Sequence, residues 1–330
     1  MSHTAGTLQF VSVNHPLRTL FAALISTFLA VPCFAWNSTG HEIIAQIAYD
    51  RLSPGTRSAV AAILRNHPRL KQDLLHDEQQ PADTGLAMFL RAATWPDMVR
   101  YPAHPLNRTE NHPHWHFVDF PFDLDGANGP QPVVAWDGQS DPANLFQAMD
   151  KVTAQFKDPD TPPSRRAIDL CWIEHLAGDI HQPLHSTSLF SKEYPQGDQG
   201  GNLEMVLGND DYPIPLHAYW DDVEGLFLTP DEVRKAADRI EAAHPASQLT
   251  NQIADLSVVD WAMESHAIAL SVVYQNGTLP HATKEQAISD PHSVPALPDG
   301  YAQKALAAAD VRMALAGYRL AAVVSQLIKS

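Results

Sequence analysis

Cysteine and basic residues are scarce in this 330-residue sequence. Two cysteines cannot form the disulfide framework of a small stapled domain, which excludes that class of protein. Only 22 Lys and Arg stand against 38 Asp and Glu, a formal charge of −16, so a simple basic nucleic-acid-binding module is excluded as well. Outside the N-terminal segment, uninterrupted apolar runs of 18 residues are also missing. We therefore expect no membrane span in the mature protein.

Histidine is the residue that is unusually abundant, with 17 copies. A content of 45% hydrophobic and 8% aromatic residues argues against intrinsic disorder, and the length suits one large domain or two small ones. Histidine is the commonest metal ligand in proteins. A chain that is rich in both His and Asp can be acidic because it holds cations.

The N-terminus has the pattern of a secretory signal. Residues 20–31 are twelve apolar or small residues that follow Arg18, and residues 33–35 place a small residue at each cleavage-site position. An uncleaved membrane anchor is the alternative, but twelve helical residues span about 18 Å, which is short of the roughly 30 Å of a bilayer core. We predict a signal peptide that is cleaved after Ala35 and leaves Trp36 as the new N-terminus.

The mature chain is then residues 36–330, which we interpret as a single domain that is secreted or periplasmic. Residues 1–35 hold one Arg and no Lys, Asp or Glu, so the mature chain carries a formal charge of −17. Cys33 leaves with the signal, and Cys171 has no partner for an intramolecular disulfide. An exported chain without disulfides depends on a large core or on metals for its stability.

Helical periodicity dominates the mature chain and predicts an all-α fold. The segments expected to be helical are 41–52, 54–67, 86–98, 142–156, 164–180, 247–274 and 301–328. A β-hairpin is predicted near residues 202–207, with a turn at 208–210. The Pro-rich stretches 158–163 and 278–298 are expected to be loops. The prediction is a mainly helical domain with one small hairpin and long loops.

Two pairs of His and Asp have the spacing of metal ligands. His175 and Asp179 are four residues apart, which places both side chains on one helix face. His217 and Asp221 repeat this spacing, and His185 follows the first pair after a helix-ending Pro183. For one isolated pair, a salt bridge on the helix surface is the alternative. Two pairs within 50 residues favour a metal site.

Three further residues are candidates on weaker grounds. His116 lies in a segment that we expect to be extended, where His114 and His116 share one face. Asp97 follows Pro96 and could instead cap a turn, and His41 could be an ordinary polar residue at a helix N-terminus. Each of these alone leaves both interpretations open.

Taken in order, these residues resemble the zinc-dependent, single-strand-specific type I nucleases of fungi, plants and bacteria. The resemblance covers nearly the whole mature chain. The matching single residues are Trp36, Trp95, Asp97, Arg100, His175 and His217, and the matching segments are residues 40–41, 116–119, 178–179, 182–185, 200–202, 220–221 and 316–321. Each motif is common by itself. Their order and spacing after a cleavage site are specific.

The resemblance implies three zinc ions. One site would use Asp97, His116, His175 and Asp179. A second would use the free amine and carbonyl of Trp36, with His41, and Asp179 as a bridge. The third would use His185, His217 and Asp221. Zinc accepts such N and O ligands, and two close metal ions can generate a nucleophile near neutral pH.

The resemblance also assigns the residues that contact the substrate. Arg100 would contact the phosphate, although a surface salt bridge is the alternative. Phe117 would stack on a nucleobase and Asp119 would accept hydrogen bonds from it, with an ordinary core aromatic as the alternative for Phe117. Asn202 would contact the metal-bound water or the phosphate. Asn37 departs from the family, which commonly has Gly there.

The implied function is a secreted, monomeric endonuclease that hydrolyses single-stranded DNA and RNA to 5′-phosphate products and extends to 3′-nucleotidase activity. A zinc-dependent phospholipase C is the closest rival. In that family the first His lies further from the terminal Trp and the third site tends to end in Glu, whereas here the spacing is five and the last ligand is Asp221. A secreted zinc-binding protein without catalysis is the other alternative.

Overall fold

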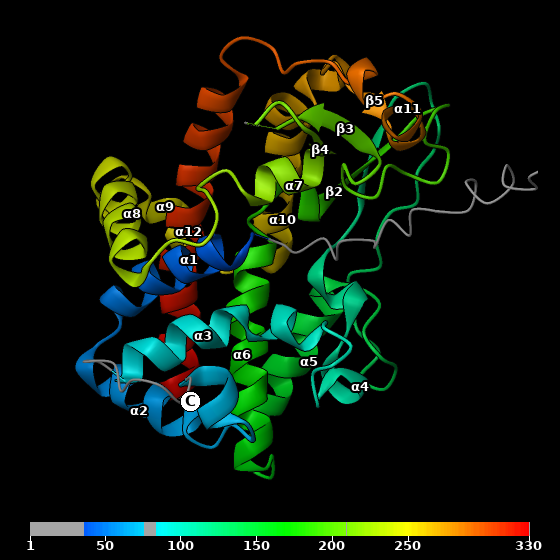
Figure 1. Cartoon of the computed structure of the whole chain (residues 1–330). Helices are drawn as coiled ribbons and strands as arrows, with labels where there is room; N and C mark the ends of the chain where they lie inside the picture. Colours follow the sequence, from blue (N-terminus) through cyan, green and yellow to red (C-terminus); the bar gives the residue numbers. More distant parts are fainter. Residues whose placement is uncertain (1–35, 76–83, 209, 330) are drawn as a thin grey trace, which may run out of the picture. The chain divides into compact units, whose positions relative to one another are not determined.

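The computed structural model describes residues 36–75, 84–208 and 210–329. The predicted signal peptide, residues 1–35, lies outside the described residues, so its prediction is not tested by the structure. The described residues belong to one compact unit, Cys33–Ser330. This unit is mainly helical (Figure 1), which confirms the all-α prediction.

The helices are α1 (Ser38–Arg51), α2 (Pro54–Leu64), α3 (Thr84–Val99), α4 (Asn107–Glu110), α5 (Leu145–Lys157), α6 (Pro163–Asp179), α7 (Leu216–Asp221), α8 (Pro230–Ala243), α9 (Thr250–Ala254), α10 (Val258–Ile268), α11 (Lys284–Ser289) and α12 (Tyr301–Lys329). The strands are β1 (Phe120–Asp123), β2 (Thr187–Phe190), β3 (Glu204–Leu207), β4 (Pro213–Pro215) and β5 (Ala282–Thr283). Short 3₁₀ turns at Pro113–His116 and Pro183–Ser186 carry residues of the site.

Local signals explain where the main helices begin. The Asn37 side chain accepts a hydrogen bond from Gly40 N at 3.0 Å and caps α1. Pro163 occupies the first turn of α6, where its missing N–H costs nothing. Helix α5 begins at Leu145, three residues later than predicted, because Asn144 caps it through Gln147 N.

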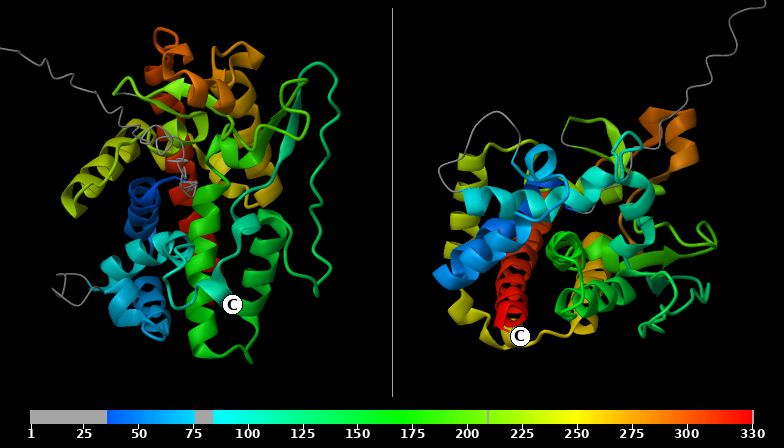
Figure 2. Two further views of the ribbon diagram at one scale, coloured as in Figure 1. Left: turned by 45° about the vertical axis from the view of Figure 1, so that its right-hand side comes forward. Right: turned by 90° about the horizontal axis from the view of Figure 1, so that it is seen from below.

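Helices α1, α3, α6 and α12 meet around the main hydrophobic core. Helix α1 packs on α12 and α3, and α6 packs on α3 and α5. Helices α6 (green) and α12 (red) lie side by side in each view (Figures 1 and 2). Gly317 lets α12 approach α1, because a Cβ there would lie 2.5 Å from Ile47 Cγ2.

Helix α12 is long and apolar enough to cross a membrane by length and composition, but 67% of its most apolar window is buried inside the structure. Two arginines lie in the middle of this helix and are buried. Arg312 Nη1 donates to Glu264 Oε2 at 2.6 Å, and Arg319 contacts the same carboxylate through both Nη atoms. Arg319 Nη1 also lies 2.9 Å from His181 Nε2. We therefore interpret α12 as a core helix that this polar network anchors.

The strands form two small sheets. The predicted hairpin is confirmed, since β3 pairs antiparallel with β4, and β5 adds to its other edge. The parallel pair of β1 and β2 was not predicted. Its two strands come directly after His116–Asp119 and after His185, so the pair holds these two segments side by side.

Two predictions about the C-terminal half are wrong in detail. The expected helix 247–274 is interrupted after α9, because Asp255 adopts an extended conformation and Ser257 caps the new helix α10. The expected loop 278–298 contains β5 and α11. Thr283 and Gln286 form a capping box that starts α11 within this Pro-rich stretch.

The expected extended conformation of His114–His116 is also wrong. Residues Pro113–His116 form a 3₁₀ turn, and extended backbone begins only at Phe117. Pro113 is preset for the first turn of a helix, and the His112 ring stacks on Trp115 with 3.7 Å between centroids. As a result His114 is exposed, whereas His116 is buried.

Candidate metal centre

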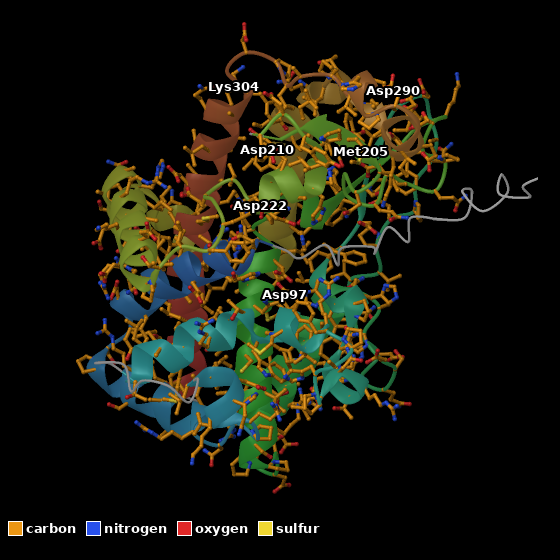
Figure 3. All side chains as sticks on the ribbon, viewed as in Figure 1. Asp97, Met205, Asp210, Asp222, Asp290 and Lys304 are labelled. Atoms are coloured by element: carbon orange, nitrogen blue, oxygen red, sulfur yellow. The ribbon has the colours of Figure 1, made fainter. Side chains whose placement is uncertain are left out.

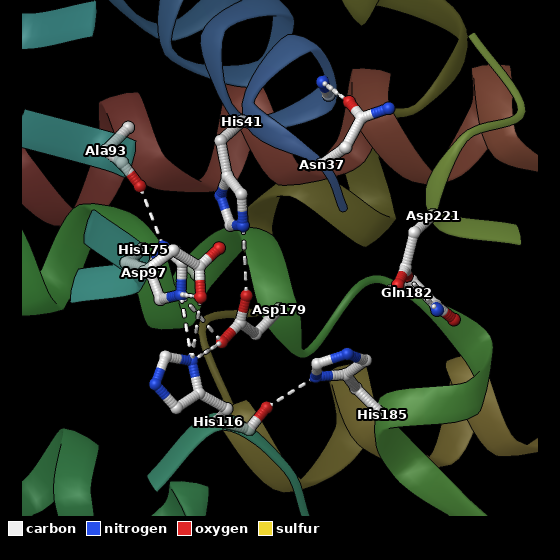
Figure 4. A network of polar contacts seen from close by, with 12 residues as sticks. Asn37, His41, Ala93, Asp97, His116, His175, Asp179, Gln182, His185 and Asp221 are labelled. Carbon is white, nitrogen blue, oxygen red and sulfur yellow. Dashed lines mark hydrogen bonds and ion pairs between the residues drawn. The ribbon is translucent and has the colours of Figure 1, made fainter. Parts of the chain in front are cut away.

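Helix α6 carries the predicted pair His175 and Asp179 into the interior of the structure. Both side chains are fully buried, at 0% exposure, so a salt bridge on the helix surface is excluded. Figure 4 shows both residues pointing toward side chains from α1, α3 and the turn Pro113–His116. The α6 face with these two residues is therefore the base of the site.

Four predicted residues come together in the first cluster. His175 Nε2 lies 2.9 Å from His116 Nδ1 and 3.2 Å from Asp179 Oδ2. Asp97, at the end of α3, places Oδ1 3.7 Å from His175 Nε2 and 3.9 Å from His116 Nδ1. Such spacings suit ligands that surround one ion.

His41 reaches the same place from α1. Its Nε2 lies 3.2 Å from Asp179 Oδ1, and its ring stacks on His175 with 4.1 Å between centroids. Gly178 makes this approach possible, because a Cβ at that position would lie 2.7 Å from His41 Nδ1. Asp179 therefore directs one carboxylate oxygen to His41 and the other to the first cluster.

The third cluster consists of His185, His217 and Asp221, as predicted. The two Nε2 atoms lie 3.0 Å apart, and His217 Nε2 lies 3.5 Å from Asp221 Oδ2. Gln182 donates from Nε2 to Asp221 Oδ1 at 2.7 Å and fixes that carboxylate. All four residues are buried.

The tautomers of His185 and His217 favour a cation between them. His185 Nδ1 donates to the His116 carbonyl at 2.6 Å, and His217 Nδ1 donates to the Gly200 carbonyl at 2.6 Å. A carbonyl only accepts, so each Nδ1 carries the hydrogen and each Nε2 presents a lone pair. Two lone pairs that face each other at 3.0 Å repel unless a positive charge lies between them.

His175 follows the same rule. Its Nδ1 donates to the Ala93 carbonyl at 2.8 Å, so Nε2 presents its lone pair to the first cluster. His41 Nε2 and Asp179 Oδ1 are buried, lie 3.2 Å apart without good hydrogen-bond geometry, and have no other hydrogen-bond partner within the described residues. Buried polar atoms without partners are costly. The donor sets therefore fit metal ions, which these buried His and Asp groups could hold.

Burial sets the charge state of these groups. It lowers the pKa of His41 to about 4 and raises the pKa of Asp97 and of Asp179 to about 6 each. At neutral pH the imidazole is thus uncharged and both carboxylates are ionised. Paired buried anions without a cation are unfavourable, so the site attracts positive charge.

The start of the predicted mature chain lies beside α1 and α7. Trp36 is fully buried, and a Cβ on Gly40 would lie 2.7 Å from the Trp36 Cβ. Asn37 N donates to the Asp221 carbonyl at 3.3 Å. The Asn37 side chain donates to Asp222 Oδ1 at 2.9 Å, so this departure from the family anchors the segment beside α7.

Among the predicted substrate residues, Arg100 lies beside the first cluster. Arg100 Nη1 is 3.4 Å from Asp97 Oδ1, and its side chain is 17% exposed. Phe117 and Asp119 flank the buried Val118 in extended backbone. Their side chains therefore lie on the face opposite to Val118, and both are partly exposed. Burial raises the pKa of Asp119 to about 6, and the nearby Asp198 adds to this.

Asn202 is held locally, since its Nδ2 donates to the Gln199 carbonyl at 2.8 Å. The proposed contact of Asn202 with phosphate stays a prediction. Gly200, in the same loop, contacts the site directly, because its carbonyl orients His217. This position requires glycine for two reasons. Its φ is +62°, and a Cβ at this position would lie 2.6 Å from the Leu184 carbonyl oxygen. His181 has other partners, since its Nδ1 donates to the Ala177 carbonyl and its Nε2 accepts from Arg319 Nη1.

Asp198 is the functional residue that sequence reasoning missed. It is fully buried and accepts hydrogen bonds from Leu189 N, Gly200 N and Gly201 N, and from the hydroxyl of Tyr274. It thereby shapes the loop whose Gly200 carbonyl holds His217. The only signal in the sequence is an Asp two residues before a Gly pair, which is common in loops.

Comparison with known proteins gives consistent matches. The model of the S1/P1 nuclease family matches residues 36–329. Nuclease S1 of Aspergillus oryzae (strain ATCC 42149 / RIB 40) is 23% identical over 212 residues, which cover 62% of this chain and 59% of that protein. Endonuclease 4 of Arabidopsis thaliana is 23% identical over 343 residues, covering 96% of this chain and 98% of that protein.

Replacing Asp198 tests its supporting role. In Asp198→Asn one acceptor oxygen becomes an amide donor that faces backbone N–H groups, so the loop must distort. We expect a loss of about 2 kcal/mol in the free energy of unfolding and a loss of roughly 10–100-fold in the affinity for a divalent metal ion, probed with zinc, at the third cluster. Denaturant unfolding and zinc titration measure these, with the exposed Asp238→Asn as control. Wild-type values for both quantities would contradict this role.

Proposed function

Because the chain belongs to the S1/P1 nuclease family, we propose that it is a zinc-dependent endonuclease that cleaves single-stranded DNA and RNA. The proposal includes 5′-phosphate products and 3′-nucleotidase activity on nucleotides. It also includes export, with the mature enzyme acting as a secreted or periplasmic monomer. The convergence of buried His and Asp side chains in the candidate metal centre is the observation that carries it.

The details of the ligand set favour a nuclease over a phospholipase C. His41 follows Trp36 by five residues, and Asp221 rather than Glu ends the third cluster. The contact of Arg100 with Asp97, and the presence of Phe117 and Asp119 directly after His116 in the chain, favour catalysis over simple zinc storage.

The proposed ligands assign each metal position to residues of this chain. Asp97, His116, His175 and Asp179 would hold one zinc ion. Trp36, through its amine and carbonyl, would hold a second with His41 and Asp179. His185, His217 and Asp221 would hold a third. When bound, the zinc ions supply Lewis acidity toward phosphate oxygens and lower the pKa of water.

The chain's own side chains would then position the substrate. Arg100 is next to Asp97 and would donate to a phosphate oxygen, stabilising its developing negative charge. The Phe117 ring would stack on a base, while the Asp119 carboxylate accepts from base N–H groups. Stacking requires an unpaired base, which favours single strands, and a π-face accepts any base, so sequence preference should be weak.

The activity is tested by presenting the mature protein with single-stranded DNA, RNA, duplex DNA and phosphatidylcholine. We expect 5′-phosphate products from the two single-stranded substrates, loss of activity on chelation and recovery with zinc. Release of choline phosphate without nucleotides would identify a phospholipase C. Hydrolysis of none of these substrates by the zinc-loaded protein would leave a zinc-binding protein without catalysis.

Asp179→Asn tests the bridging carboxylate. One oxygen of Asp179 faces His41 and the other faces His175, so the loss of its charge should empty two metal positions together. We expect bound zinc to fall from three ions to about one and the rate to drop roughly 10³-fold, which corresponds to about 4 kcal/mol. Elemental analysis and the nuclease assay measure these, with Asp238→Asn as control. Near-normal zinc content and rate in Asp179→Asn would contradict bridging.

An added N-terminal Met tests the role of the Trp36 amine. Only cleavage before Trp36 frees an α-amine at this position, with an ordinary pKa of about 7.7–8.0. Trp36 is fully buried, so the extra residue also disturbs the packing around Gly40. We expect the Met-extended protein to lose about one zinc ion and most of its activity. An extension after the exposed Lys329 is the control. Full zinc content in the Met-extended protein would exclude the terminal ligand.

A further inference from the structure

Leu226 and Phe227 form an apolar pair on the surface, outside the three clusters. Phe227 is 87% exposed and Leu226 is 52% exposed, and no other large apolar side chain among the described residues is as exposed as Phe227. The pair belongs to the segment 222–229, which joins α7 to α8. Figure 3 shows Asp222, the first residue of this segment, next to α7. Exposure alone does not mark a site, because single apolar side chains are common on protein surfaces.

The backbone at Phe227 is strained as well. Its φ is +56°, in the left-handed region that a bulky side chain rarely adopts. The other non-glycine residues with positive φ in the described parts of the chain are all Asp, Asn or Gln. A glycine would remove this strain, and the exposed phenyl ring gains little from packing in return. Backbone strain that packing does not offset is concentrated at ligand-binding sites, so Phe227 is a candidate for one.

Hydrogen bonds on both sides fix this pair to the start of α1. Asn37 Nδ2 donates to the Gly225 carbonyl at 2.8 Å, and Leu228 N donates to the Thr39 hydroxyl at 3.4 Å. Gly225 N also donates to the Asp222 carbonyl at 2.8 Å, which closes a turn before the pair. The pair is therefore presented by a segment that is held in place on either side. A ligand that binds there loses little entropy by ordering the protein.

The same segment is close in the chain to two of the proposed metal positions. Asp221 of the third cluster directly precedes it, and Thr39, which it contacts, is two residues before His41. Phe227 is six residues after Asp221, which corresponds to at most about 22 Å of extended chain. A stacked strand rises about 3.4 Å per nucleotide, so roughly seven nucleotides cover that distance. A strand of this length with one phosphate at the metal centre can therefore reach Phe227.

The charges around the pair favour stacking over phosphate contacts. Arg239 Nη2 donates to both oxygens of Glu224, at 2.8 and 2.7 Å, and Asn37 Nδ2 donates to Asp222 Oδ1 at 2.9 Å. Both carboxylates of the segment are thus engaged by protein donors. The segment 222–229 contains no Lys or Arg that could hold a phosphate. An aromatic face binds a nucleobase without any cation, so a base is the part of a strand that suits this surface.

We propose that Phe227, with the neighbouring Leu226, is a stacking platform for an unpaired base of a single-stranded nucleic acid, several nucleotides from the cleaved bond. This inference rests on the proposed nuclease function and extends it to the length of the substrate. A base on Phe227 adds affinity only for strands long enough to reach it. The added affinity is equal in the ground state and the transition state, so it lowers KM and leaves kcat unchanged.

Strand binding to the zinc-loaded mature protein tests the proposal. The probe is a labelled ten-nucleotide thymidine strand with phosphorothioate linkages, which resist cleavage, and fluorescence anisotropy measures its affinity. We expect Phe227→Ala to weaken binding roughly 5- to 100-fold, the effect of one base–aromatic stack, and Phe227→Trp to restore it. Ile288→Ala is the control, since Ile288 is 56% exposed on α11. Equal affinities of wild type and Phe227→Ala for this strand would overturn the proposal.

Hydrolysis of unmodified strands separates this proposal from the proposed function. Phe227→Ala should raise KM for the ten-nucleotide strand by the same factor as the loss of affinity, with no such rise for a thymidine dinucleotide. Strand binding that depends on Phe227 in a wild type without hydrolysis would contradict the nuclease function and leave the platform in place. Hydrolysis in which Phe227→Ala shows the wild-type KM for both lengths would contradict the platform alone.

Thermal unfolding and self-association test the other roles of Phe227. Phe227→Gly removes the backbone strain, so its Tm should equal or exceed that of wild type while its strand affinity falls as in Phe227→Ala. A lower Tm of Phe227→Gly would indicate a packing role. A wild-type dimer that Phe227→Ala dissociates would assign the pair to a second copy of this chain, and binding to phosphatidylcholine vesicles that this variant loses would assign it to lipid. Each of these three results would overturn the proposal.

Discussion

The convergence of buried lone pairs is the constraint on which the rest of the structure depends. Asp179 and His175 on α6 meet side chains from α1, α3 and the turn at Pro113–His116, and most of the facing atoms are acceptors. Hydrophobic packing cannot offset the electrostatic repulsion and lost hydration of several acceptor atoms that face each other in a dry interior. Cations can, so the helices that form the core also deliver the ligands, and the metals would take the stabilising role that disulfides have in many exported proteins.

Main-chain carbonyls provide the second layer of this arrangement. His175, His185 and His217 each donate Nδ1–H to a carbonyl, which fixes both the tautomer and the direction of Nε2. The carbonyls belong to α3, to the turn before β1 and to the glycine loop that Asp198 holds. Ligand geometry thus depends on segments that are distant in the sequence.

The acidic chain can still attract a polyanion, because positive charge would be concentrated only where phosphate would bind.

Local geometry explains which features could be predicted. The pairs His175–Asp179 and His217–Asp221 were predictable because an i, i+4 spacing defines one helix face without tertiary information. The carbonyls of Ala93 and Gly200 were not, since any residue type carries a carbonyl and only the fold places it. The interruption of the helix at Asp255 was not predicted from the sequence. There the Asp255 side chain accepts a hydrogen bond from Ser257 N, and this one turn ends the helix despite a strong helical pattern.

The buried arginines of α12 bear on the proposed export of this chain. The helix of 29 residues contains an 18-residue window with mean hydropathy 1.3, and such a window resembles a stop-transfer sequence to the machinery that moves an unfolded chain across a membrane. Arg312 and Arg319 lie in its middle, and each adds about 2.5–3.5 kcal/mol to the cost of lateral partitioning into lipid. In an exported chain, the same guanidinium groups that bind Glu264 after folding would therefore oppose retention of the helix in the bilayer during translocation.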